Sequence, residues 1–249
     1  MLSFRRRICS AKIMKFRLLL IALALSLAAS AHAAPLTRIV FVTDGKAQAE
    51  HGGFYEAVAL GLYKQRGLDV KIRAGWPSVN VPQLLARGGA DFGIGSNSFV
   101  ALDMVRQGMP VRAIMAVFQF AGDGSSSYAN LVLAPQRWID RNPAAVQAFY
   151  DATRDGWRDY LEGDPSPANA LIKRDNPDMN DAVIAQAIAK MKALVESGDA
   201  KPFGIGAMTD LRWRRFFESA SARGLYPKDL PYQKAYDLSF MRGAPQYFG

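Results

Sequence analysis

The feature that most constrains the fold is a strand–helix–strand pattern between Ile39 and Val70. A short apolar run at 39–42 is typical of a strand that is buried on both faces. After a polar segment at 43–50, the apolar residues that recur at helical spacing are Phe54, Ala57, Val58, Gly61 and Leu62. Gly67 can then end the helix in a left-handed conformation before a second strand. The pattern predicts a parallel β–α–β unit and therefore an α/β fold.

The first strand–helix connection, residues 43–53, is the expected working surface. In an open parallel sheet, ligands bind beyond the carboxyl ends of the strands and beside helix N-termini. The candidate ligand-binding residues of this connection are Asp44, Gln48, His51 and Gly52. A histidine ring can donate to or accept from a polar heterocycle, and a glycine lets a ligand approach the backbone. The ordinary alternatives are a solvated or capping histidine and a tight turn.

Two further strands are predicted at 91–95 and 111–118, which gives a parallel sheet with helices on its faces. Ser96 and Asn97 follow the first of these strands and begin a helix. Their hydroxyl, amide and backbone N–H groups suit a carboxylate, sulfonate, phosphate or pyrimidine edge. Routine capping of the helix is the alternative.

Four segments carry a resemblance to a known family: TDGKAQAEHGGFYEAVALGLYKQRGLDVKI, ADFGIGSNS, WIDRNPAAVQAF and GDPSPANALIKRDNP. They resemble periplasmic substrate-binding proteins of ABC importers, in the subgroup similar to thiamine-pyrimidine synthases and aliphatic sulfonate binders. The resemblance implies a type II periplasmic-binding-protein-like fold of two α/β lobes that close on a small ligand. It also implies a permease partner in the inner membrane and a pyrimidine precursor of thiamine, a sulfonate, nitrate or taurine as ligand. No cofactor, metal or nucleic acid is expected.

Two positions depart from this family. Gly45 stands where the family usually has a tryptophan, so a stacking wall for a flat ligand is missing. Trp76 stands in the next loop where the family has a small residue, and it is a candidate substitute for that wall. The alternative for Trp76 is an exposed or core-edge side chain.

The chain also lacks a segment corresponding to the second lobe. After Phe120 it runs into AGDGSSS and then into SYANLVLAPQRWID, which resembles the return from that lobe. The predicted organisation is a signal at 1–33, a first lobe at 34–120, and a return strand with C-terminal helices at 121–249. Helices are expected to open at Asn142-Pro143, Ser166-Pro167, Asn180-Asp181 and Thr209, with Trp138, Trp157 and Trp213 in the core. An internally truncated protein would bind its ligand weakly, since one side of the ligand stays wet.

Residues 1–33 have the pattern of an export signal, with a basic start, an apolar run at 18–29 and the cleavage pattern Ala31-His32-Ala33. They predict a periplasmic protein without a membrane span after cleavage, and either Met1 or Met14 fits as the start. Six of the chain's 31 Lys and Arg lie in this segment, which leaves 25 against 22 Asp and Glu. The formal charge of +9 is therefore no argument for nucleic-acid binding. Cys9, the only cysteine, also lies there, which excludes disulfides and thiol nucleophiles from the mature chain.

Catalysis is the competing class of function. Thiamine-pyrimidine synthases hold pyridoxal phosphate on a lysine near a histidine, but here Gly95 and Phe99 stand at those positions. The carboxylates of Asp151 and Asp155 fall on one helix face and are expected to be solvated. The sequence therefore favours a substrate-binding component of an importer over an enzyme. A synthase-like enzyme and a non-binding remnant are the alternatives.

Overall fold

The computed structural model describes residues 35–76, 78–119 and 127–241. The described residues from Leu36 onward belong to one compact unit. The predicted export signal, Cys9 and the Phe120–Ala121 junction lie outside the described residues. Within the described residues, no helix is long and apolar enough to cross a membrane. The division of the chain at residue 120 and the loss of a second lobe stay predictions.

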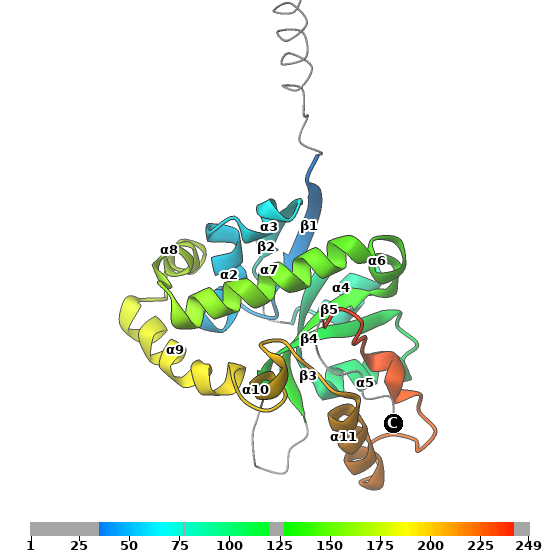
Figure 1. Ribbon diagram of the computed structural model, residues 1–249. Helices are drawn as coiled ribbons and strands as arrows, with labels where there is room; N and C mark the ends of the chain where they lie inside the picture. The colour runs from blue at the N-terminus through cyan, green and yellow to red at the C-terminus, as the bar shows by residue number, and fades with distance from the viewer. Residues whose placement is uncertain (1–34, 77, 120–126, 242–249) are drawn as a thin grey trace, which may run out of the picture. The chain divides into compact units, whose positions relative to one another are not determined.

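A single five-stranded sheet organises the described residues (Figure 1). Its strands, in spatial order, are β2 (Leu68–Arg73), β1 (Thr37–Val42), β3 (Phe92–Asn97), β5 (Tyr128–Pro135) and β4 (Val111–Gln119). The strand β1 pairs in parallel with β2 and β3, as predicted. The strand β5, which was predicted only as a return strand, is antiparallel to both β3 and β4, so the sheet is mixed. A short connection can join neighbouring strands only when they run in opposite directions, and β5 follows β4 closely in the sequence.

The first β–α–β unit contains a broken helix. The short 3₁₀ helix η1 (Ala49–His51) leads into α2 (Gly52–Ala59) and α3 (Leu62–Gln65). The break lies at Gly61, whose φ of 68° is left-handed and interrupts the helix that the apolar spacing predicted. The apolar stripe therefore continues through two helical pieces.

Two asparagines begin the next helices, α4 (Val81–Ala86) and α5 (Ser98–Arg106). The side chain of Asn80 accepts a hydrogen bond from the backbone N–H of Gln83 at 3.0 Å. The side chain of Asn97 accepts from the N–H groups of Phe99 and Val100 at 3.0 and 3.3 Å. Both are ordinary N-caps, which was the alternative for Asn97.

The part of the chain after β5 is helical among the described residues. Its elements are α6 (Gln136–Arg141), α7 (Pro143–Glu162), α8 (Ser166–Asp175), α9 (Asp181–Val195), α10 (Ala200–Phe203), α11 (Asp210–Ala222) and the 3₁₀ helix η2 (Tyr232–Ala235). The predicted starts of α7, α8, α9 and α11 are confirmed. Thr209 caps α11, whereas the side chain of Asn142 makes no capping hydrogen bond.

Aromatic rings join α2 and α7 to the sheet, as α7 runs beside α2 in Figure 1. The ring of Phe149 lies 5.4 Å from that of Phe41 and 4.7 Å from that of Phe92, between centroids. Trp157 lies edge-on to Phe54 at 5.8 Å. Trp157 and Trp213 are fully buried, as predicted. Trp138 is half-buried, and its indole N–H donates to a carboxylate at 3.1 Å.

The glycine pair at the start of α2 permits this packing. A Cβ on Gly53 would lie 2.2 Å from the ring of Trp157, and one on Gly52 would lie 2.0 Å from the ring of Tyr160. Real Cβ atoms do not come so close to a ring. The space beside both glycines is therefore filled by α7 rather than open to a ligand.

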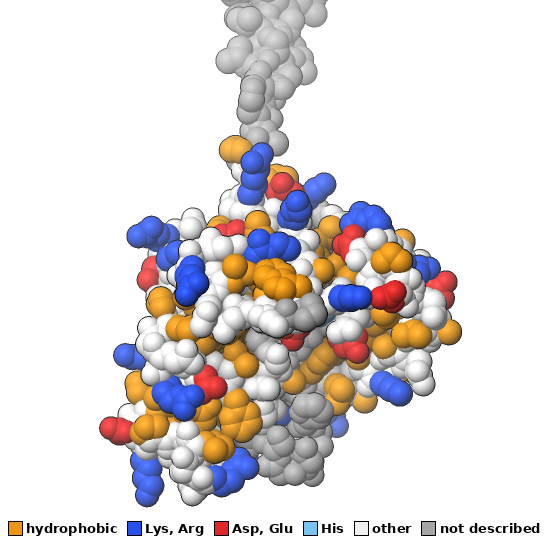
Figure 2. All heavy atoms as spheres, turned by 180° about the vertical axis from the view of Figure 1, so that it is seen from behind, with side chains coloured by type: hydrophobic (Ala, Val, Ile, Leu, Met, Phe, Trp, Pro, Cys, Tyr) orange, Lys and Arg blue, Asp and Glu red, His pale blue; other side chains and the backbone are white. Residues whose placement is uncertain are grey.

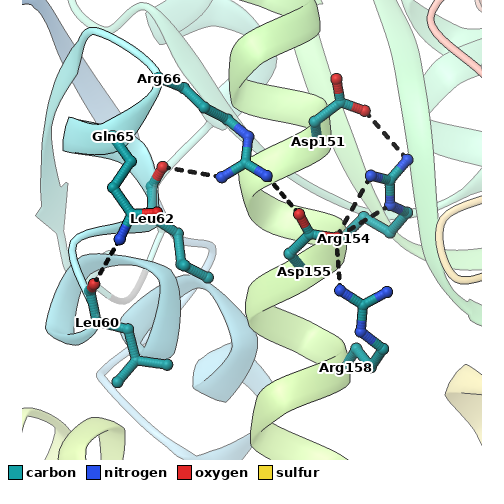
Figure 3. Close-up of polar contacts among 8 residues, drawn as sticks. All are labelled: Leu60, Leu62, Gln65, Arg66, Asp151, Arg154, Asp155 and Arg158. Carbon is teal, nitrogen blue, oxygen red and sulfur yellow. Dashed lines mark hydrogen bonds and ion pairs between the residues drawn. The ribbon is translucent and has the colours of Figure 1, made fainter.

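Asp155 of α7 is not solvated, so that prediction is wrong (Figure 3). Its side chain is 14% exposed and forms ion pairs with Arg66, at the end of α3, and with Arg154 and Arg158 on its own helix. Asp151 pairs with Arg154 at 3.1 Å. Arg66 also donates to the carbonyl of Leu62 at 3.1 Å. Helical spacing shows that two carboxylates share a face, but it does not show which arginines of other elements reach that face.

Basic and acidic side chains are interspersed on the surface shown in Figure 2. The basic ones are spread over this face rather than gathered into one patch. A nucleic-acid-binding face would concentrate them.

Candidate functional site

Two loops at the carboxyl end of the sheet are tied together and position Asp44. The hydroxyl of Thr43 donates to the carbonyl of Gly45 at 2.7 Å and accepts from the N–H of Gly75 at 3.0 Å. The same N–H of Gly75 lies 2.9 Å from the carbonyl of Gly45. A Cβ on Gly75 would lie 2.3 Å from the carbonyl oxygen of Thr43, so the close approach requires glycine. The loop after β1 is thereby fixed against the loop after β2.

The Asp44 carboxylate has one partner on each oxygen. Its Oδ1 lies 3.4 Å from Nε2 of His51, and its Oδ2 accepts from the hydroxyl of Ser96 at 3.2 Å. The side chain is 35% exposed. Partial burial acts to raise the pKa of Asp44, but the hydrogen bonds and charge interaction with His51 and the bond from Ser96 hold it below its ordinary value. The group is therefore ionised at neutral pH.

His51 contacts Asp44 and is buried. It is 1% exposed, and its Nδ1 has no hydrogen-bond partner. The structure thus places His51 in contact with Asp44, and it does not line the neighbouring cavity. Sequence reasoning expected a direct contact with a ligand, whereas the geometry supports an indirect one through Asp44.

A cavity of about 370 Å³ opens beside this carboxylate, beyond the carboxyl ends of β1 and β3. It is bounded by the N-terminal part of α4 and one face of α5. Its polar lining residues are Asp44, Ser78, Asn80, Ser96, Asp103 and Gln107. The remainder of the lining is mostly apolar, including Ile94, Val100 and Met104. This combination of apolar walls and a few polar groups is typical of small-molecule sites.

Two of the seven predicted site residues, Asp44 and Ser96, line the cavity. The others lie elsewhere. Gln48 and His51 belong to the same loop but not to the lining, and Trp76 is 50% exposed. Gly52 faces Tyr160, and Asn97 caps α5.

Sequence reasoning missed four polar lining residues. Val100, Asp103, Met104 and Gln107 are spaced as one face of a helix, so the α5 contribution was readable once that helix was placed beside the cavity. Asn80 both caps α4 and lines the cavity. Ser78 has a φ of 74°, a left-handed conformation that a non-glycine residue rarely adopts. No sequence pattern predicted it.

Residues from the second half of the chain hold the loop at 43–53, called the site loop below. The side chain of Asn176, which ends α8, donates to the carbonyl of Ala47 at 2.8 Å. The side chain of Asn130 in β5 donates to the carbonyl of Glu50 at 3.0 Å. Lys46 pairs with Asp178 at the surface at 3.0 Å. The loop that carries Asp44 and His51 is therefore held from both of its ends.

Comparison with known proteins gives one family match. Residues 48–124 match the family model described as NMT1/THI5 like. That segment runs from the site loop through α2, β2, β3 and β4. The resemblance to this family is confirmed. No curated protein sequence matches the chain.

Solved structures share the periplasmic-binding-protein fold with this chain. The alkanesulfonate-binding protein SsuA from Xanthomonas axonopodis pv. citri, bound to MOPS, has a TM-score of 0.58 at 11% identity, over 83% of this chain and 100% of that one. A Candida albicans protein with the generic periplasmic binding protein fold scores 0.57 at 10% identity, over 80% and 94%. The ligand-binding component of an ABC-type import system from Staphylococcus aureus, with zinc bound, scores 0.57 at 9% identity, over 85% and 99%. At these identities the likeness shows the fold alone.

The zinc in the last of these proteins has no counterpart in a ligand cluster here. The described residues contain no group of three or more His, Cys, Asp or Glu side chains that could hold a metal ion.

Proposed function

We propose that this chain is the substrate-binding component of an ABC importer. It acts in the periplasm and delivers a small polar or heterocyclic nutrient to a permease in the inner membrane. The observation that carries the proposal is the cavity beyond β1 and β3, where Asp44 is ionised, held by two partners and still partly exposed. The fold of importer components supports the same role.

The packing at Gly95 favours binding over the synthase-like alternative. A Cβ at this position would lie 2.9 Å from Cδ1 of Leu133 in the neighbouring strand. A larger side chain here would require Leu133 to shift. Gly95 also supplies no amine for the Schiff base that such a synthase needs.

The proposed binding is weak. A site that is open on one side leaves its polar contacts in competition with water, and each such hydrogen bond contributes about 0.5–1.5 kcal/mol net. Three or four contacts leave little beyond the entropy of association, which corresponds to roughly millimolar dissociation constants. Pyrimidine precursors of thiamine and alkyl sulfonates are the ligand classes that the family suggests.

Titration calorimetry against a panel of aminopyrimidines and alkyl sulfonates tests the proposal. At least one compound is expected to bind, and Ser96→Ala is expected to weaken it by roughly 3- to 10-fold, the loss of one hydrogen bond. Ser219→Ala, on the exposed face of α11, is the matched control and leaves the affinity unchanged. A folded protein that binds no member of the panel at tens of millimolar contradicts the proposal.

A further inference from the structure

We propose that the cavity selects a ligand with a cationic, hydrogen-bond-donating head, such as a protonated amine or an amidine, on an apolar body, and that it rejects sulfonates. This inference rests on the proposed function and names the ligand class of the same site. Three observations support it: the charges that line the cavity, the partners of those charges, and the use of backbone N–H groups at the nearby helix N-termini by capping side chains.

The described lining residues include two carboxylates and no Lys, Arg or His. Asp103 is already balanced, because its Oδ1 pairs with Arg106 at 2.7 Å and accepts from the hydroxyl of Tyr226 at 3.2 Å. Arg106 is half exposed and does not line the cavity. The nearest cation of the site loop, Lys46, is paired with a surface carboxylate. Of the two carboxylates that line the cavity, Asp44 is therefore the one without a Lys or Arg partner.

The partners of Asp44 are Ser96 and His51. Ser96 is neutral. His51 contacts only Oδ1 and lies outside the lining of the cavity, so the carboxylate is the charged group that faces the cavity.

The contacts with His51 and Ser96 use one lone pair of each oxygen of Asp44, so acceptor capacity remains on the carboxylate. The loop that carries it is fixed by the hydrogen bonds of Thr43 and Gly75, so the free lone pairs are pre-positioned. A cation that reaches the cavity meets an oriented carboxylate, and it gains charge-assisted hydrogen bonds without reorganising the site.

Backbone N–H groups at the two helix N-termini beside the cavity are already used by side-chain caps. Sulfonates and phosphates bind at helix N-termini through free backbone N–H groups. At the start of α5, the N–H groups of Phe99 and Val100 donate to the side chain of Asn97. At the start of α4, the N–H of Gln83 donates to Asn80. An anion in the cavity would therefore lie beside the Asp44 carboxylate, and these capping bonds would keep the N–H groups of Gln83, Phe99 and Val100 from binding it.

Three probes of one shape test the inference: benzylamine, benzenesulfonate and benzyl alcohol, which are cationic, anionic and neutral. Binding to the full chain is measured by calorimetry or by ligand-observed NMR. Benzylamine is expected to bind at least 10-fold more tightly than benzyl alcohol, and benzenesulfonate not at all. Asp44→Asn is expected to remove the advantage of benzylamine and to leave benzyl alcohol unchanged. Asp69→Asn, an exposed carboxylate on β2 outside the lining, is the matched control and changes nothing.

The outcomes separate this inference from the function on which it rests. Binding of benzenesulfonate as tight as that of benzylamine overturns the charge selectivity and leaves the binding role standing. Benzylamine binding that survives Asp44→Asn overturns the part assigned to Asp44. A chain that binds none of the three probes and no compound of the nutrient panel loses both proposals. If Asp44→Asn does not fold, the order of the three probes on the unmodified chain still decides.

Discussion

The cavity edge and the α2–α7 contact contain the same kinds of residue, which are partly free at the first and packed at the second. Both contain glycines and carboxylates, and both belong to or adjoin the first β–α–β unit. At the cavity edge, Gly45 has no atom within 4 Å of a built Cβ, and Asp44 keeps free lone pairs. At the α2–α7 contact, Gly53 lies against an indole ring, and Asp155 is bound by three arginines.

The difference shows how to separate a binding residue from a packing residue of the same type. The sequence predicted Asp44 and Gly52 as ligand-binding residues and Asp155 as a solvated carboxylate. The two regions differ in whether other residues of the protein fill the space beside the glycine and use the lone pairs of the carboxylate. Space and lone pairs that stay free beside a cavity are available to a ligand. Space and lone pairs that other residues use stabilise the fold.

The largest effect is expected from Gly53→Ala. The new methyl group would overlap the ring of Trp157, which is fully buried and cannot move aside without disturbing the aromatic core. Overpacking of a core costs typically 1–3 kcal/mol, and we expect a loss near or above 3 kcal/mol in the free energy of unfolding. Urea denaturation measures it.

Gly45→Ala is the matched control for that substitution. It adds the same methyl group in open space, so its effect on stability is expected to stay within about 0.5 kcal/mol. Equal losses in the two variants would show that the two regions do not differ in packing.

A second test uses Glu56, a fully buried carboxylate of α2 that accepts from the N–H of Ala168 at 3.0 Å and has no partner on Oε1. Burial raises the pKa of Glu56 to about 7; the Ala168 bond lowers it, and the charges of Asp159 and Asp164 raise it further. The folded chain thus binds more protons than the unfolded chain between the ordinary pKa near 4.5 and about 7. Stability from this group is fully present below that window and is lost as pH rises through it.

Glu56→Gln keeps the acceptor for Ala168 and cannot ionise. We expect it to stabilise the protein by roughly 2 kcal/mol at pH 8 and to have little effect at pH 4.5. Urea denaturation between these pH values measures the difference, with Glu218→Gln on the exposed face of α11 as control. A stability gain that is the same at both pH values would contradict the role of ionisation.

A smaller effect is expected from Asp155→Asn, which leaves three arginines without their shared carboxylate. Since these side chains are partly exposed, solvent reduces the cost, and we expect a loss of about 1–2 kcal/mol that shrinks in high salt. Asp44→Asn is expected to cost less stability than this. The reverse order would break the distinction between a structural and a binding carboxylate.

Much of the local structure could be predicted because the signals are local. The strands β1 and β2, the caps Asn80 and Thr209, and the buried face of α7 follow from apolar spacing and from capping chemistry. The single helix predicted after the site loop failed only where Gly61 takes a left-handed conformation.

The remainder depends on contacts between distant parts of the chain. The insertion of β5 between β3 and β4 is a choice of partner that period-two alternation does not encode. Asp44 and Ser96 were predictable because both follow sheet strands, and such strand ends meet at one edge of a parallel pair. That His51 faces Asp44 rather than solvent, and that Arg66 reaches Asp155, are facts of tertiary packing.

The anchoring of the site loop by Asn176 has a consequence for which parts of the chain the site needs. The hydrogen bond from Asn176 to Ala47 spans 129 residues, and that from Asn130 to Glu50 spans 80. We therefore expect ligand affinity to depend on the second half of the chain as well as on the first, because residues of both halves hold the loop that carries Asp44.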